Sequence, residues 1–184
     1  ETNVGSEAFQ IPETAIDAFD EVFNEANNIY NSSEKVDEIE AATKALEEAM
    51  QALKNPTLNA PKKGELFCIA NISEGFAYKN NAVSPVYNEA KAEDGEYDLK
   101  WYHIVDANYA QALKFTPVEG QKNQYTISFI DEEGNTRYFS TQALAGYMDG
   151  GNVSTRHDRI RATKEAEKAL PFEISLAGEG VYKL

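Results

Sequence analysis

Cysteine is almost absent from the sequence, which contains only Cys68 and can therefore form no intrachain disulfide. A chain without disulfides is more typical of a cytoplasm or a bacterial envelope than of a eukaryotic secretory route. Cys68 lies in the apolar run 66–69, and no cationic or histidine side chain flanks it. We therefore expect a small buried side chain at this position and not a reactive thiolate.

Histidine is also scarce, and neither His103 nor His157 has metal-ligand spacing with the other or with the cysteine. The sequence lacks a Gly-x-Ser-x-Gly elbow, a phosphate-cradling glycine loop and an HExxH helix. Asp94, Glu96 and Asp98 alternate around a glycine but do not complete a calcium loop, which favours a solvated turn. These absences predict a chain that is not an enzyme and has no catalytic residues, no metal and no cofactor.

Basic charge is sparse, because 17 Lys and Arg residues stand against 31 Asp and Glu residues, for a net charge of −14. An acidic chain repels phosphate groups, so we expect neither nucleic acid nor an anionic membrane surface as a partner. No apolar run approaches the ~20 residues of a membrane-spanning helix, and no charged-then-apolar leader opens the chain. Membrane insertion is therefore not expected. The acidity is concentrated in residues 1–54, which carry thirteen acidic and three basic side chains.

This acidic segment does contain a clear helical pattern of apolar side chains. They recur every three or four positions from Ile16 to Tyr30 and again from Val36 to Leu53, which predicts two amphipathic helices. The polar run 31–33 interrupts the pattern and offers N-caps for the second helix. Two such helices joined by about three residues must pack as an antiparallel hairpin, and the alanines around the stripe allow close approach.

The run AATKALEEAMQALKN, at 41–55, follows an acidic helix and a polar turn. In this it resembles the FIVAR-type helical modules found between the domains of large bacterial surface and glycan-degrading proteins. The resemblance covers residues 14–55. It implies an accessory or spacer module within a multidomain, extracytoplasmic bacterial protein. Such modules are usually longer, so the alternative is that the hairpin lies against the domain that follows it.

The segment NPTLNAPKKG, at 55–64, contains two prolines and ends in glycine, which predicts a linker. Beyond it the helical period disappears, and short β-rich runs broken by Gly, Asn and Asp predict an all-β domain over 65–184. The DEEGN loop predicts a hairpin between two of these runs, and a short helix is expected at 162–170. The expected strands are 66–72, 97–105, 113–118, 125–130, 137–141 and 172–176.

Two parts of the β region resemble each other, namely ALKFTPVEGQKNQYTI at 112–127 and ALPFEISLAGEGVYKL at 169–184. A third unit would begin near Val181, close to the last residue of the sequence. Repeated short strands of this kind resemble a β-trefoil of the ricin-B-lectin or fascin-like type, although the Gln-x-Trp signature is absent. The resemblance implies an incomplete trefoil-like domain from a longer protein; an incomplete barrel or sandwich is the alternative. The aligned positions are Phe115 with Phe172, and Tyr125 with Tyr182.

The candidate ligand-binding residues are aromatic rings close to short polar side chains. A sugar packs its C–H surface against a ring, and Asp, Asn or Gln side chains bind its hydroxyl groups. Trp101 and Tyr102 follow the acidic loop, and Tyr147 precedes Asp149 and Asn152 in a glycine-containing turn. Loops on a β scaffold often carry binding sites, so these five residues are the predicted carbohydrate site. The alternatives are a core role for the tryptophan and an ordinary turn for the second set.

The sequence therefore predicts an α+β chain in two parts: a helical hairpin over 1–54, a linker over 55–64 and an all-β, trefoil-like domain over 65–184. The predicted function is a non-catalytic accessory module of a secreted, cell-surface or periplasmic protein. Its expected partners are a carbohydrate ligand and neighbouring domains of the same polypeptide. The alternative is a structural spacer or protein–protein adaptor without a small-molecule ligand. Clustered exposed rings would favour the ligand site, and buried rings would favour the adaptor.

Overall fold

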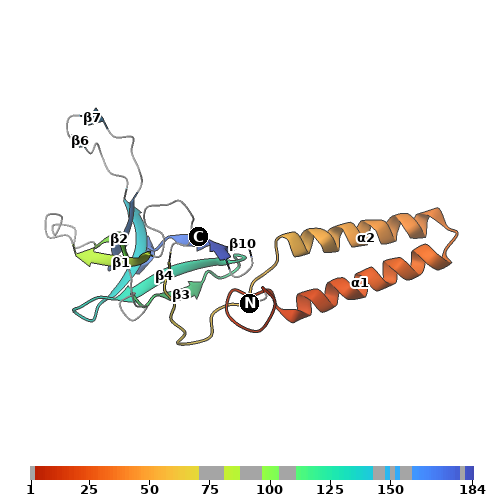
Figure 1. The fold of residues 1–184 in the computed structure, drawn as a ribbon, viewed down its shortest axis with the longest axis horizontal. Coiled ribbons are helices and arrows are strands. Elements are labelled where there is room, and N and C mark those ends of the chain that lie inside the picture. The colour runs from red at the N-terminus through yellow and green to blue at the C-terminus, as the bar shows by residue number, and fades with distance from the viewer. Residues whose placement is uncertain are drawn as a thin grey trace. The chain divides into compact units, whose positions relative to one another are not determined.

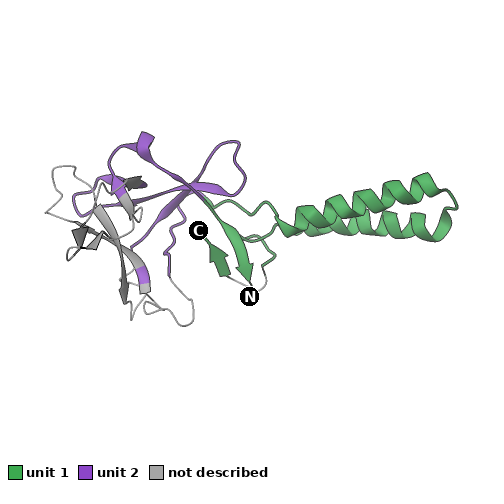
Figure 2. Ribbon diagram, turned by 90° about the horizontal axis from the view of Figure 1, so that it is seen from above, with its two compact units in different colours: residues 1–62, 173–184 green, residues 63–172 purple. Residues whose placement is uncertain are grey.

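The computed structural model has two N-terminal helices followed by antiparallel β-sheets, which confirms the α+β class in two parts. The chain forms two compact units, coloured separately in Figure 2. Unit 1 comprises residues 1–62 and 173–184, and unit 2 comprises residues 63–172. The structure describes residues 3–70, 81–87, 97–103, 111–142, 148–149, 152–153, 159–178 and 181–184.

Helices α1 (Glu13–Ser32) and α2 (Val36–Lys54) run side by side in opposite directions, which confirms the predicted hairpin (Figure 1). The polar turn between them is held by Ser33, whose hydroxyl accepts from the backbone N–H of Lys35 at 3.1 Å. The same hydroxyl donates to the carboxylate of Glu38 in the first turn of α2 at 2.6 Å. Among the described residues, neither helix has the apolar length needed to cross a bilayer.

The hairpin buries very little of its own surface. Ala26 is the only buried residue of α1, at 9% exposure, and α2 has none. Two helices share one interface, so side chains on either side of the line of contact stay open to solvent unless a third element covers them.

The rest of unit 1 is built around Asn59, which lies in the segment predicted as a linker. Its side-chain amide donates to the carbonyl oxygens of Gly5 at 2.7 Å and Glu7 at 3.2 Å. Its backbone exchanges hydrogen bonds of 2.8 Å with Phe9 and Gln10. The segment 55–62 is therefore an ordered part of unit 1 that fixes the N-terminal residues in place.

Phe9 anchors this N-terminal segment although its φ of 65° is uncommon for a residue with a side chain. It is 8% exposed, and its ring lies edge-on to that of Tyr182, with centroids 6.1 Å apart. Tyr182 belongs to a two-stranded sheet formed by β10 (Ser175–Gly178) and β11 (Val181–Lys183). Both ends of the described chain thus contribute to unit 1.

A seven-stranded antiparallel sheet dominates the β region, with the order β1-β2-β8-β5-β4-β3 and β9 paired with β4. Strand β8 lies between β2 and β5, so residues distant in sequence become neighbours in the sheet. A separate short sheet pairs β6 with β7, and a 3-10 helix covers Ala166–Lys168. The strand bounds are β1 Asn81–Tyr87, β2 Tyr97–His103, β3 Lys114–Pro117, β4 Gln124–Ile130, β5 Thr136–Gln142, β6 Met148–Asp149, β7 Asn152–Val153, β8 Arg159–Thr163 and β9 Pro171–Glu173.

Four of the predicted strands correspond to β2, β3, β4 and β5, and the hairpin over the DEEGN loop is confirmed by the pairing of β4 with β5. The expected helix at 162–170 is wrong in its first part, because Ala162 and Thr163 belong to β8. The expected strand at 66–72 is reduced to single bridges at Phe67 and Ala70, and positions 71–72 lie outside the described residues.

The expectation that Cys68 is buried is wrong, because its side chain is exposed. The bridge from Phe67 to Leu113 turns the phenylalanine towards Phe115, with ring centroids 5.6 Å apart. Side chains alternate along an extended segment, so the next residue points the other way. The apolar character of the run therefore did not decide the burial of each of its members.

The core of unit 2 lies on one face of the sheet, where buried apolar side chains alternate with the others along β4 and β5. Phe139 is 1% exposed and pairs in register with the fully buried Ala162 of β8. Its ring makes edge contacts with Phe129 at 6.4 Å and Phe172 at 6.0 Å between centroids. Such T-shaped pairs stabilise a core beyond the area that they bury. The other buried apolar residues of this face are Leu113, Phe115, Tyr125 and Ile127.

The turn between β4 and β5 is closed by a buried ion pair between Asp131 and Arg137. The guanidinium Nε lies 2.7 Å from the carboxylate, and the two side chains are 0% and 3% exposed. The other carboxylate oxygen accepts from the backbone N–H groups of Glu133 at 3.0 Å and Asn135 at 2.8 Å. Burial raises the pKa of Asp131, but the hydrogen bonds from Arg137 and Asn135 outweigh it, so the pKa is lowered overall.

Replacing Asp131 with Asn is expected to destabilise unit 2 by roughly 1–3 kcal/mol at neutral pH, because the buried guanidinium loses its counter-charge. A carboxyl whose pKa is lowered on folding stabilises the fold above its unfolded pKa of about 3.9, and this stability is lost as the pH falls through the folded value. The wild-type free energy of unfolding should therefore fall more steeply with acidification than that of Asp131→Asn in urea denaturation. Equal slopes, with Glu132→Gln as the matched control, would contradict this role.

Replacing Asn59 with Ala removes two hydrogen bonds to the N-terminal segment and is expected to destabilise unit 1 by about 1–2 kcal/mol. Thermal denaturation followed by the helical circular dichroism signal would measure the change. Asn24→Ala, at an exposed position of α1, is the control and should stay within about 0.5 kcal/mol of wild type. An unchanged midpoint for Asn59→Ala would show that the segment 55–62 is ordered by something else.

Candidate functional site

Asp131 carries the only buried carboxylate in the part of the chain that the structure describes. Within those ranges, no group of three or more His, Cys, Asp or Glu side chains is placed to hold a metal ion. Asp131 is fully committed to closing a turn, and its lowered pKa keeps it ionised. This carboxylate therefore has a structural role in the turn between β4 and β5.

The predicted carbohydrate site falls largely on residues whose side chains are not described. Trp101 and Tyr102 lie in β2 opposite Val83 and Ala82 of β1. Tyr147 lies outside the described residues. The two groups of candidates belong to different sheets, and the glycan site stays a prediction. The remaining two candidates, Asp149 and Asn152, are register partners in β6 and β7.

The aromatic rings of unit 2 whose side chains are described contribute mainly to its core. Phe115, Tyr125, Phe129 and Phe139 are all 6% exposed or less. Burial raises the pKa of the Tyr125 hydroxyl, as expected for a phenol withdrawn from water. These four rings are therefore not available to stack on a ligand.

The helical hairpin presents the opposite situation. An open apolar groove runs along one side of the line where α1 and α2 meet, and we call it the aromatic groove. Tyr30 is 74% exposed and Phe23 is 48% exposed. The groove is lined by Phe23, Ala26, Asn27 and Tyr30 of α1 and by Ile39, Ala42, Thr43 and Leu46 of α2.

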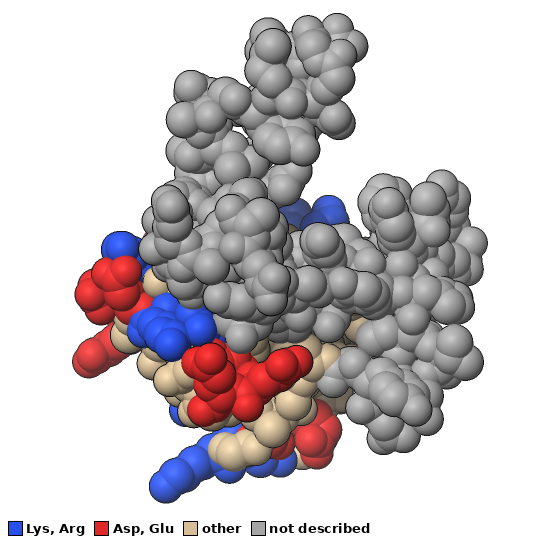
Figure 3. All heavy atoms as spheres, turned by 90° about the vertical axis from the view of Figure 1, so that its left-hand side faces the viewer, with Lys and Arg blue, Asp and Glu red and all other residues tan. Residues whose placement is uncertain are grey.

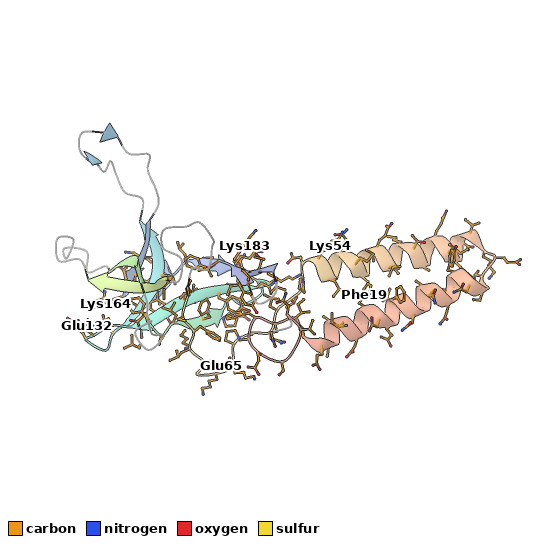
Figure 4. All side chains as sticks on the ribbon, viewed as in Figure 1. Phe19, Lys54, Glu65, Glu132, Lys164 and Lys183 are labelled. Carbon is orange, nitrogen blue, oxygen red and sulfur yellow. The ribbon has the colours of Figure 1, made fainter. Side chains whose placement is uncertain are left out.

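Local sequence explains why these side chains gather there. Phe23 and Tyr30 are seven residues apart, which is two helical turns, so they lie on the same stripe of α1. Phe19, which Figure 4 shows on the side of α1 towards α2, stacks on Phe23 with centroids 6.3 Å apart and planes at 23°. Ala26 and Ala42 lie between the larger groups and form the floor. The stripe is wider than the single contact with α2 can cover.

The other side of the hairpin also has a groove, with smaller side chains in its lining. This second groove is lined mainly by Val22, Ile29 and four alanines, Ala26, Ala41, Ala42 and Ala45. Two acidic residues, Glu25 and Glu38, enter its lining. None of the described large apolar side chains that are strongly exposed lines this side. The aromatic groove is therefore the surface of the hairpin with the most apolar area to lose to a partner.

Acidic charge surrounds the aromatic groove without entering its lining. Residues 13–54 carry eleven acidic and three basic side chains. Glu40 and Glu47 lie three residues before and four residues after Thr43 on α2, and Asp20 lies three before Phe23 on α1, so all three border the groove. All three carboxylates are exposed. By contrast, basic and acidic side chains are intermingled on the described face drawn in Figure 3.

The sequence predicted the apolar stripes but assigned them to packing within the hairpin. The groove could have been recognised from the breadth of the stripe, because Phe23 and Tyr30 are large and α2 contributes two small residues, Ala42 and Thr43, to the lining opposite them. Val36 and Met50, which are 67% and 47% exposed, extend the open apolar surface along α2.

The groove predicts a contrast between two substitutions. Tyr30→Ser should change the stability of the hairpin by no more than about 0.5 kcal/mol, because its ring is already in solvent. Ala26→Leu should destabilise it by about 1–3 kcal/mol, because Ala26 is buried where the helices meet and a longer side chain there must displace its neighbours. Thermal denaturation followed by helical circular dichroism would measure both. If Tyr30→Ser were as damaging as Ala26→Leu, the ring would belong to the hairpin's own core.

Comparisons of the chain with protein-family models, with curated proteins and with solved structures find no match.

Proposed function

We propose that the chain is a non-catalytic protein–protein adaptor module whose working surface is the aromatic groove. The observation that carries this proposal is the exposure of Phe23 and Tyr30 on a hairpin in which only Ala26 is buried. Contiguous apolar surface of this kind on a soluble domain marks an interaction site more often than chance exposure does.

The energetics favour a partner that is a protein. Covering the two rings would remove apolar area worth roughly 1–2 kcal/mol for each ring. Aromatic side chains set among small neighbours are the residues that most often dominate protein interfaces. The hairpin itself also gains, because a partner across Ala26 and Ala42 would supply the core that two helices lack.

Unit 2 and the hairpin differ in how their described rings are placed. Phe115, Tyr125, Phe129 and Phe139 pack into the core of unit 2, whereas Phe23 and Tyr30 are exposed and line the aromatic groove. Within this proposal the chain remains an accessory module of a larger extracytoplasmic protein. Unit 2 then serves as a folded neighbour of the hairpin, without a small-molecule ligand.

The trefoil-like arrangement of the β region also remains a proposal. In its favour, each of the two similar segments contains a β-hairpin, and Tyr125 and Tyr182 lie in the second strand of their hairpins. Phe115 lies in the first strand of its hairpin, but Phe172 lies one strand earlier, in β9. The three-fold repeat is not confirmed, and the described strands of the main sheet follow one continuous order.

A display library of helical peptides, selected on the whole chain, would test the adaptor function. Binding clones should lose most of their affinity for a Phe23→Ser, Tyr30→Ser double variant. They should keep it for Ile130→Ser, which removes a 57% exposed apolar side chain from unit 2. Both variants should retain the wild-type helical signal.

A library that yields no clone dependent on the groove would overturn the adaptor function. Saturable binding of the chain to one saccharide class on a glycan array, abolished by Asp149→Ala, would instead support the carbohydrate-binding module.

A further inference from the structure

We infer that the occupant of the aromatic groove is an amphipathic helix whose apolar face is flanked by Lys or Arg. This inference rests on the adaptor function proposed above and adds the chemistry of the partner. It is argued from the spacing of the groove residues, from the shape of the floor and from the charge of the rim.

The spacing of the lining residues favours a helix. Phe23, Ala26 and Tyr30 on α1 are separated by three and four residues, and Ile39, Ala42 and Leu46 on α2 repeat the same steps. The groove therefore presents ridges of helical period on both walls, over about 10 Å of helix length. A third helix can insert its own ridges between them, in the way that amphipathic helices bind in grooves of other helical proteins.

The floor of the groove favours branched apolar side chains on that helix. Ala26 and Ala42 are lining residues of both grooves, so they lie where the two helices approach each other. Their short side chains leave depressions between the large side chains of the walls. Leucine or isoleucine at every third or fourth position of the incoming helix would fill these depressions and cover Phe23 and Tyr30.

The acidic residues that border the groove favour basic residues beside the apolar face of the incoming helix. Asp20, Glu40 and Glu47 border the groove on both helices, and all are exposed. Two of the three basic side chains of the hairpin lie close to carboxylates outside the rim: Lys35 is paired with Glu38 at 2.6 Å, and Lys44 lies 3.8 Å from Glu48. The third, Lys54, lies in the last turn of α2, seven residues beyond Glu47. An incoming helix with basic flanks would meet complementary charge on either side, whereas acidic flanks would be repelled.

The same charges argue against a second copy of this chain as the occupant. Pairing two copies through their grooves would bring together two hairpins, each of which carries eleven acidic and three basic side chains over residues 13–54. Such a dimer would juxtapose the acidic rims, which disfavours self-association.

Two synthetic peptides with the same leucine face, one flanked by Lys and the other by Glu, would test the inference by fluorescence anisotropy on the whole chain. The Lys-flanked peptide should bind about tenfold more tightly at low salt, as expected for three exposed charge pairs. The difference should shrink at high ionic strength. Both affinities should fall with Phe23→Ser, which places the peptide in the groove.

A rim variant supplies the matched control. The triple change Asp20→Asn, Glu40→Gln and Glu47→Gln should abolish most of the preference for Lys flanks while leaving the leucine face bound. The pair Glu119→Gln and Glu173→Gln, which removes two exposed carboxylates that belong to neither helix, should leave the preference intact.

The outcomes separate the inference from the function on which it rests. Equal binding of the two peptides, both dependent on Phe23, would overturn the basic flank and leave the adaptor function standing. Failure of both peptides, together with a display library without groove-dependent clones, would overturn both. Self-association of the chain in sedimentation, abolished by Phe23→Ser, would overturn the inference in favour of a second copy.

Discussion

The organisation of the hairpin depends on one constraint: two helices share a single interface. Each helix can bury one narrow stripe against the other. In this hairpin Ala26 is the only residue of the two helices that is buried. Alanine allows the helices to approach closely but contributes little apolar area of its own. The large side chains beside it, above all Phe23 and Tyr30, are left in solvent. The exposed groove is therefore a direct consequence of pairing a broad apolar stripe with a partner rich in alanine.

Unit 2 buries four of its described rings, whereas the hairpin leaves Phe23 and Tyr30 exposed. Its sheet gathers rings from β3, β4, β5 and β9 onto one face, and their edge contacts, at 6.0–6.4 Å between centroids, form its core. The only buried ion pair among its described residues, Asp131 with Arg137, holds the turn between β4 and β5. The exposed apolar surface of the hairpin supports the proposal that a partner binds there.

Features governed by local sequence were predictable. The two helices, the strands β3 to β5 and the hairpin over the DEEGN loop follow from periodicity and turn residues within short windows. Long-range pairing was not predictable: nothing local indicates that β8 inserts between β2 and β5. The alternation in Arg159–Thr163 is a strand signal, but the helix-forming residues that follow obscured it. Of the candidate site, the sequence supplied the apolar stripe, while its exposure depends on what lies opposite and had to come from the structure.

The composition of unit 1 has a consequence for the order in which the protein is made. Its residues come from 1–62 and from 173–184, so the whole of unit 2 is an insertion within it. During synthesis the helices and the segment around Asn59 leave the ribosome long before β10 and β11. The contact between the rings of Phe9 and Tyr182 can therefore form only after β11 has been made. Unit 2 can reach its native contacts in that interval, because domains generally fold as units while the chain emerges. Unit 1 is therefore completed last, although it begins first.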